Sequence, residues 1–215
     1  MALSLPFRIR FVLSLLLAAS VSLVGCGPTQ ESAPDKPAAP ATADSRTFEP
    51  IEAEALDEAA VAQRERGTAA RDALFASLLQ RLMAVISSSG PETAIAVCGE
   101  LVPELGAEVR KEHDLKIGRT SFKLRNPSNV PPAWAQAWVD ERVDEPRYAR
   151  ADDGTLAMLL PIRLKQECLM CHGAVDAMDP KVVAAIDRKY PDDAATGFAE
   201  GDLRGWFWIE VPAAK

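Results

Sequence analysis

Two cysteines and a histidine lie within five residues of one another in the C-terminal quarter of the chain. The segment reads Cys168-Leu169-Met170-Cys171-His172, and it holds two of the four cysteines and one of the two histidines. This is the C-x-x-C-H pattern by which c-type haem is attached. In such a site both thiols bind the porphyrin as thioethers, and the adjacent histidine ligates the iron from one face. The pattern predicts one covalently attached haem c, with Cys168 and Cys171 as attachment points and His172 as an iron ligand.

Three other chemistries use cysteines at this spacing, and a motif of five residues leaves them open. A zinc site needs one more ligand, which Cys98 or His113 could supply, but no second C-x-x-C or H-x-x-H accompanies the first. A thioredoxin-like redox pair is expected in a βαβ context, which the surrounding pattern does not indicate. A disulfide would leave the adjacent histidine without a role. Haem attachment accounts for all three side chains, so we favour it.

The N-terminal residues predict the compartment in which this chemistry takes place. Arg8 and Arg10 precede an apolar run that ends in the sequence LVGC, at residues 23 to 26. The run is shorter than the roughly 20 residues that a transmembrane helix needs, which favours an export signal over a permanent span. Its last four residues resemble the lipobox of bacterial lipoproteins, although an ordinary signal peptide or a short anchor would leave Cys26 as a thiol. The resemblance implies a lipoprotein signal peptide over 1–25 and lipidation of Cys26.

These features place the protein at the cell envelope. Several acyl chains on Cys26 would hold it stably on a lipid membrane. Residues 26–50 are rich in proline, alanine and polar side chains, which predicts a disordered linker. Residues 51–215 are long enough for one domain with a substantial core. We expect an exported, lipid-anchored protein on the periplasmic or cell-envelope face, where c-type haem is attached.

The charge balance excludes one class of partner. Without Arg8 and Arg10 the chain keeps 22 of its 24 basic residues against 31 acidic ones, a net charge of −9. Such a chain offers little to neutralise phosphates, so nucleic acid is not an expected partner.

Hydrophobic periodicity predicts an α+β domain built on a small antiparallel sheet. A broad apolar stripe over 71–86 indicates a helix that faces the core, and the sequence Ser-Ser-Ser-Gly ends it. Pro91 then suits the first turn of a second helix, which Pro103 should kink. We also expect a short helix at 134–138, a helix at 179–189, an extended segment at 118–125, a hairpin formed by 148–151 and 155–164, and a last strand at 206–211.

The iron of a c-type haem has a second axial position, and the residues alone leave its ligand open. If the other three cysteines are consumed, Cys98 is the remaining thiol in an oxidising compartment, where iron binding would protect it. It lies on the apolar face of the second predicted helix, so it could also be an inert core residue. His113 is flanked by charged residues, which is typical of a solvated helix end. The other candidates are the thioethers of Met83, Met158 and Met178, although methionine usually fills cores.

Four stretches together resemble a known family. They read "AIAVC" with Pro103 after it, "IGRTSFKLRNPSN" with Trp134 downstream, "ECLMCHG" and "YPDDAATGFAEGDLRGWF", and they occur in this order. They resemble bacterial c-type haem domains with a PAS-like fold, which occur alone or as extracytoplasmic input modules of histidine kinases and chemoreceptors. The resemblance implies a PAS-like domain with a covalently bound haem, proximal ligation by His172 and axial thiolate ligation by Cys98. Because we see no kinase or receptor segment here, we expect any signalling output to pass through a partner protein.

The resemblance also gives a role to the extended segment. Arg119, Lys123 and Arg125 alternate along it and could pair with the haem propionates, although they could equally form a solvated strand face. A thiolate ligand favours ferric iron and lowers the potential. We therefore expect a redox or small-ligand sensing haem protein with Cys and His axial ligands, and as the alternative a membrane-tethered electron-transfer cytochrome. We do not expect an enzyme, because a haem enzyme needs distal acid-base residues. The remaining histidine, His113, is expected at a solvated helix end.

Overall fold

The computed structural model describes residues 45–214, except for the side chains of residues 98–102. The expected signal peptide, Cys26 and most of the expected linker lie outside the described residues. Within the described part of the chain, no helix has both the length and the apolarity that a membrane crossing requires. The strands are β1 (Phe48–Ile51), β2 (Lys116–Thr120), β3 (Arg147–Ala151), β4 (Leu156–Arg163) and β5 (Leu203–Val211), and the α-helices are α1 (Glu58–Ser89), α2 (Pro91–His113), α3 (Gln136–Asp140), α4 (Leu169–His172) and α5 (Pro180–Lys189).

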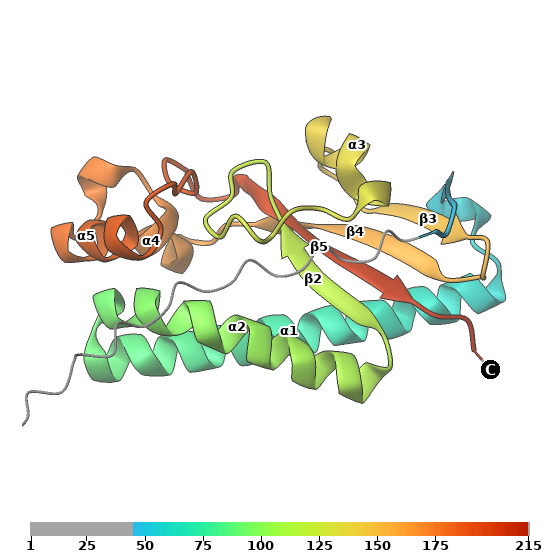
Figure 1. Ribbon diagram of the computed structural model, residues 1–215, viewed down its shortest axis with the longest axis horizontal. Coiled ribbons are helices and arrows are strands. Elements are labelled where there is room, and N and C mark those ends of the chain that lie inside the picture. Colours follow the sequence, from blue (N-terminus) through green and yellow to red (C-terminus); the bar gives the residue numbers. More distant parts are fainter. Residues whose placement is uncertain (1–44, 215) are drawn as a thin grey trace, which may run out of the picture. The chain divides into compact units, whose positions relative to one another are not determined.

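An antiparallel sheet forms the centre of the domain. Its strand order is β1-β3-β4-β5-β2, and every neighbouring pair is antiparallel. Helices α1 and α2 lie along one face of the sheet, α3 lies on the other, and α4 and α5 lie at one end (Figure 1). This arrangement confirms the expected α+β class with a small antiparallel sheet.

Helix α1 is about twice as long as its apolar stripe predicts. The side chain of Asp57 caps it by accepting a hydrogen bond from the Ala60 amide (2.8 Å). Its N-terminal half packs closely on the sheet at Gly67, where a Cβ atom would lie 2.6 Å from the sulfur of Met158. Small residues allow this approach but give little amphipathic signal. For this reason the sequence pattern indicates the C-terminal half of the helix and misses the rest.

The apolar stripe of α1 divides between the core and a cavity. Leu74 is buried in the core that α1 and α2 form with the sheet, and Phe75 packs against that core. Phe75 and Leu78 belong to both regions, because they pack against that core and also line a cavity. The later side chains of the stripe line the cavity without belonging to the core: Leu79, Leu82, Met83 and Ile86. The expectation that the whole stripe faces the core is wrong from Leu79 onward, because α1 continues past the sheet towards α4 and α5 (Figure 1).

Several expected elements are confirmed. Gly90 ends α1 with φ 85°, and Pro91 is the first residue of α2. The hairpin of β3 and β4 turns at residues 152–154, where Gly154 has φ 80°. Helix α5 begins after Asp179, whose side chain accepts a hydrogen bond from the Lys181 amide (2.8 Å). The last strand is also present, although it begins at residue 203 rather than 206.

Two expected boundaries are wrong. Composition places the start of the domain at residue 51, but β1 already pairs with β3 from Phe48 onward, so a boundary at residue 50 is too late. The extended segment expected to reach Arg125 leaves the sheet after Thr120. There the hydroxyl of Ser121 accepts a hydrogen bond from the Lys123 amide (3.0 Å), which stabilises a local turn in place of a ladder.

A buried carboxylate ties the beginning of the described chain to the end of β5. The side chain of Glu210 is 5% exposed and accepts hydrogen bonds from Lys116 (3.1 Å) and from the indole N–H of Trp134 (3.0 Å). It also pairs with the guanidinium of Arg46, just before β1. Three segments distant in sequence are therefore joined at one acid.

Candidate functional site

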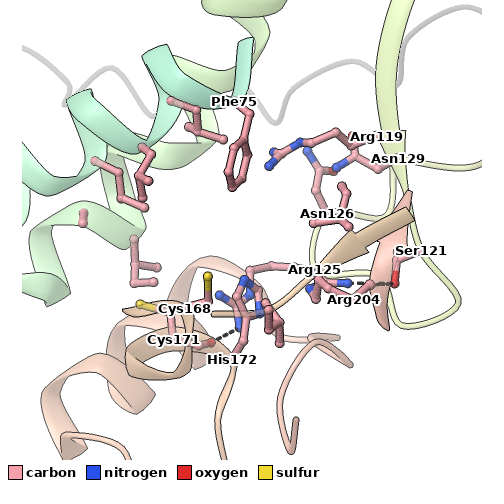
Figure 2. A pocket seen from close by; sticks show the side chains of 18 of the residues that line it. Phe75, Arg119, Ser121, Arg125, Asn126, Asn129, Cys168, Cys171, His172 and Arg204 are labelled. Carbon is pink, nitrogen blue, oxygen red and sulfur yellow. Dashed lines mark hydrogen bonds between the residues drawn. The ribbon is translucent and has the colours of Figure 1, made fainter. Parts of the chain in front are cut away.

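A cavity of about 260 Å³ lies between the helical pair α1 and α2 and the segment that carries the C-x-x-C-H motif. Side chains of α1 and α2 make one side of it apolar, whereas the end of β2, the following loop and the start of β5 make another side polar. In Figure 2, Phe75 lies across the cavity from Cys168 and His172. Arg119 and Arg204 lie on the polar side in the same view.

The three residues of the motif meet at this cavity. Cys168 ends the 3₁₀ turn η3 (Gln166–Cys168), and Cys171 and His172 belong to the one-turn helix α4 that follows. Residues three and four apart lie on one side of such a continuous turn. All three side chains line the cavity, and all three are half-buried. The expectation that they act together is therefore consistent with their position.

The imidazole of His172 is held in one tautomer. Its Nδ1 lies 2.7 Å from the backbone carbonyl oxygen of Ala195, which can only accept a hydrogen bond, so Nδ1 carries the hydrogen. Nε2 keeps its lone pair, which a metal ligand requires. Burial, followed by the positive charges of Arg204 and Arg125, lowers the pKa of His172 from 6.5 to about 3. The ring is therefore neutral at physiological pH.

The three cations expected on one strand face are separated. Arg119 and Arg125 line the cavity, as expected, although an ion pair engages Arg125. Because the chain turns after β2, Lys123 does not line the cavity. Its ammonium donates to the carbonyl of Thr196 (3.3 Å) and lies over the ring of Phe198 (4.9 Å). The structure therefore does not bring Lys123 to the site, and the prediction of a continuous cationic face is wrong.

Arg204 is a cavity residue that the sequence pattern does not reveal. Its Nη1 donates to the hydroxyl of Ser121 (2.7 Å) and to the carbonyl of Lys123 (2.9 Å), which fixes the guanidinium. Burial, and then the charges of Arg125 and Arg119, lower its pKa to about 10. The pairing of β4 with β5 is irregular at this point, because Ile162 pairs with Gly205 and Arg163 with Leu203, so the register skips Arg204. Simple alternation along β5 therefore could not have placed the side chain, and the nearby Gly205 was the one available signal of irregularity.

The candidates for the second axial position are placed as follows. Met83 lines the cavity, but Met158 is buried in the main core and Met178 in a smaller core with α5, and neither of these two belongs to the cavity wall. His113 ends α2 and does not line the cavity either. Cys98 lies in α2, and its side chain is outside the described residues, so its ligation stays a prediction.

A zinc site completed by Cys98 would involve a side chain outside the described residues, and one completed by His113 finds no support in the described part of the chain. There, no group of three or more His, Cys, Asp or Glu side chains lies close enough together to hold a metal ion.

The family model described as Tll0287-like matches residues 44–212. The chain belongs to the Tll0287-like family. Among solved structures, the domain is similar to that of the cyanobacterial heme-protein Tll0287, with 24% sequence identity over 66% of this chain and 92% of that chain and a TM-score of 0.47. No curated protein matches the sequence.

The cavity of this Tll0287-like domain has the features of a site for a large flat group. Leu79, Leu82 and Ile95 offer apolar surface, and Arg119 and Arg204 offer charge for carboxylates on the polar side. The motif adds two thiols that can form covalent bonds and one neutral imidazole that can ligate a metal. Apolar surface, cations and a neutral imidazole are groups that suit the ring, the propionates and the iron of a haem.

Proposed function

We propose that this Tll0287-like domain binds one haem c covalently in the cavity. Cys168 and Cys171 would hold the porphyrin, and His172 would ligate the iron through Nε2. One observation carries the proposal: both thiols and an imidazole fixed as the Nδ1–H tautomer line one cavity. Each thiol would add across a vinyl double bond, with the sulfur on one carbon and the hydrogen on the other, so attachment consumes no oxidant. Membership of the family agrees with haem as the cofactor, without regard to how it is attached, because Tll0287, whose name the family carries, is a cyanobacterial heme-protein.

The residues of the cavity fit this group. The apolar side chains of α1 would cover the ring and exclude water from it. Arg204 is a rigid donor, since Ser121 and the Lys123 carbonyl hold its guanidinium. We assign it, together with Arg119, to the propionates. We leave Arg125 and Lys123 out of this assignment, because a buried carboxylate already compensates the charge of Arg125 and Lys123 does not line the cavity.

The wider function that we propose is redox or small-ligand sensing at the cell envelope. It rests on three predictions from the sequence, which are a PAS-like domain, export with a lipid anchor at Cys26, and axial ligation by Cys98 together with His172. The bound haem would supply a redox-active iron. A thiolate at Cys98 would keep its potential low, and the apolar cavity would admit small uncharged ligands. Output would pass to a signalling or redox partner protein, and we propose no enzymatic activity.

One observation favours the second candidate, a membrane-tethered electron-transfer cytochrome. Met83 and Met170 line the cavity, and each is 37% exposed, so the site reaches the surface between α1 and α4. A cofactor edge at the surface allows electron transfer to a partner. The two candidates differ in the second axial ligand, because a thiolate disfavours a high-potential carrier whereas a thioether suits it.

Expression with a c-type maturation system tests the proposal. We expect a haem that stays bound after denaturation in the wild type and in His113→Ala, and loss of covalent attachment in Cys168→Ser with Cys171→Ser. His172→Ala should keep the attachment and lose the proximal ligand, which absorption spectra detect. A wild-type protein that matures without covalent haem would refute the proposal.

Cys98→Ala separates sensing from electron transfer. If Cys98 ligates the iron, this variant loses the ferric thiolate spectrum and its midpoint potential rises. Met83→Leu is the matched variant for thioether ligation, and it should leave both properties unchanged. An unchanged spectrum in Cys98→Ala would exclude thiolate ligation and, with a loss in Met83→Leu, would identify an electron carrier.

A further inference from the structure

The acceptor of the His172 hydrogen bond lies in a loop that is fastened to the motif. Residues 193–198 run beside α4, where the amide of Phe198 donates to the His172 carbonyl (3.0 Å) and that of Gly197 to the Gly173 carbonyl (2.8 Å). On its other side the loop is bonded to the segment after β2, through the Ala194 amide and the Leu124 carbonyl (3.0 Å). The loop is thus held between the motif and the segment that contains Arg125.

Arg125 and Asp193 form the polar centre of this contact. The guanidinium meets the carboxylate as a fork, with Nε 3.0 Å from Oδ1 and Nη2 3.2 Å from Oδ2. Their side chains are only 14% and 6% exposed. Removing one partner of such a buried pair leaves a charge without compensation, so the geometry is strongly enforced. A lysine could not reproduce the fork, because an ammonium is a point charge.

The same pair reaches both sides of His172. Arg125 Nη2 donates to the carbonyl of Cys171, the residue before the histidine (2.7 Å), and approaches the carbonyl of Ala195 (3.4 Å). Asp193 Oδ1 accepts a hydrogen bond from the amide of Ala195 (3.2 Å). The carbonyl of Ala195 is the group that holds Nδ1 of His172. Arg125 and Asp193 therefore fix the backbone next to His172 and the Ala195 carbonyl oxygen that accepts the hydrogen bond of the imidazole.

We propose that Arg125 and Asp193 are positioning residues for the iron ligand. They act through the Ala195 carbonyl, which sets the tautomer and the rotation of the His172 ring. This inference rests on the proposed function, because it assigns the ring to an iron atom. It also replaces the role that the sequence suggested for Arg125, which was a contact with propionate. Groups that orient a ligating histidine commonly influence a metal site almost as strongly as the ligand itself.

The test uses the full-length, haem-loaded protein and three variants. Asp193→Asn keeps the shape and removes the charge of the acid, whereas Arg125→Lys keeps the charge and removes the fork. Asp192→Asn is the matched control, because Asp192 is the adjacent, exposed acid. Solvent exchange of the His172 Nδ1–H is measured by ¹⁵N NMR, with His113, the other histidine of the chain, as an internal reference. The ferric spectrum is recorded by electron paramagnetic resonance.

We expect the first two variants to bind haem and to exchange the Nδ1–H about fivefold faster, the factor of one ordinary hydrogen bond. Both should also show more than one ferric low-spin species, because the ring is no longer held in one orientation. Asp192→Asn should match the wild type in both measurements. Unchanged exchange and a single species in Asp193→Asn would overturn the inference, as would full retention of wild-type behaviour in Arg125→Lys.

Two further outcomes are distinguishable. If Asp193→Asn does not accumulate as folded protein, Asp193→Glu displaces the carboxylate by one methylene and permits the same comparison. If the wild type carries no covalent haem, the proposed function fails. Exchange of the Nδ1–H in the haem-free chain then shows whether the pair still orients the ring.

Discussion

The division of α1 between core and cavity leads to a prediction about two leucines on one helix. Leu74 is 3% exposed in the main core, and Leu82 lines the cavity two turns later. Leu74→Ala leaves a void among packed neighbours and should cost about 2–5 kcal/mol of unfolding free energy. In the haem-free protein, Leu82→Ala removes a side chain that already borders open space. Its cost should stay below about 1 kcal/mol, since Leu82 is only half-buried and its truncation widens an existing cavity instead of opening a new one.

Haem should change the cost of only one of the two substitutions. In the haem-loaded protein Leu82 would pack against the ring, so Leu82→Ala should become destabilising by about 1–3 kcal/mol. Leu74→Ala should cost the same in both forms. Urea unfolding followed by far-UV circular dichroism measures all four values, and unchanged m values would support a two-state comparison.

Two results would contradict this prediction. If Leu82→Ala costs as much as Leu74→Ala in the haem-free protein, the end of α1 is packed as core and the cavity is not open there. If haem leaves the cost of Leu82→Ala unchanged, the cofactor does not contact that wall.

Three other predictions concern glycines, charge and pH. Gly67→Ala should lower the unfolding free energy by about 1–2 kcal/mol, because a clash with buried side chains exceeds the gain in helix propensity. Gly106→Ala, which meets only the end of a flexible arginine, should raise it by up to about 1 kcal/mol, and urea titration measures both. Arg204→Gln should lower the haem midpoint potential in a redox titration, because a cation that favours the reduced state is removed, whereas Lys123→Gln should leave it unchanged. In the haem-free protein, the free energy of unfolding should fall as the pH decreases from 6.5 towards 3, since the unfolded chain protonates His172 in this range and the folded chain does not. His172→Gln should flatten this dependence, and urea unfolding at several pH values in the same range measures it.

The sequence was informative where one physical signal dominated. The spacing of Cys168, Cys171 and His172 predicted that the three side chains act at one place, and all three line the same cavity. Their role in haem attachment stays a prediction. The hairpin around Gly154 and the strand that ends at Val211 were predicted as well, since turn residues and β-branched or aromatic runs mark them locally.

Prediction failed where distant segments decide the structure. The run from Arg119 to Arg125 has a period of two, but the hydroxyl of Ser121 bonds locally and ends the strand. The role of Arg204 depends on partners about 80 residues earlier in the chain. The stripe of α1 looks uniform in sequence, and only the length of the sheet decides which half of it meets a core and which half meets a cavity.

Strand β5 links the site to the N-terminal end of the described chain. Arg204, at one end of the strand, lines the cavity, and Glu210, near the other, holds Arg46 and Lys116. Six residues of extended backbone separate them, a span of roughly 20 Å. From Trp206 to Glu210 the strand is paired on both sides and neither stretches nor shortens, so β5 acts as a rigid spacer over most of this span. The distance between the cavity and Arg46, near the beginning of the described chain, should therefore stay constant.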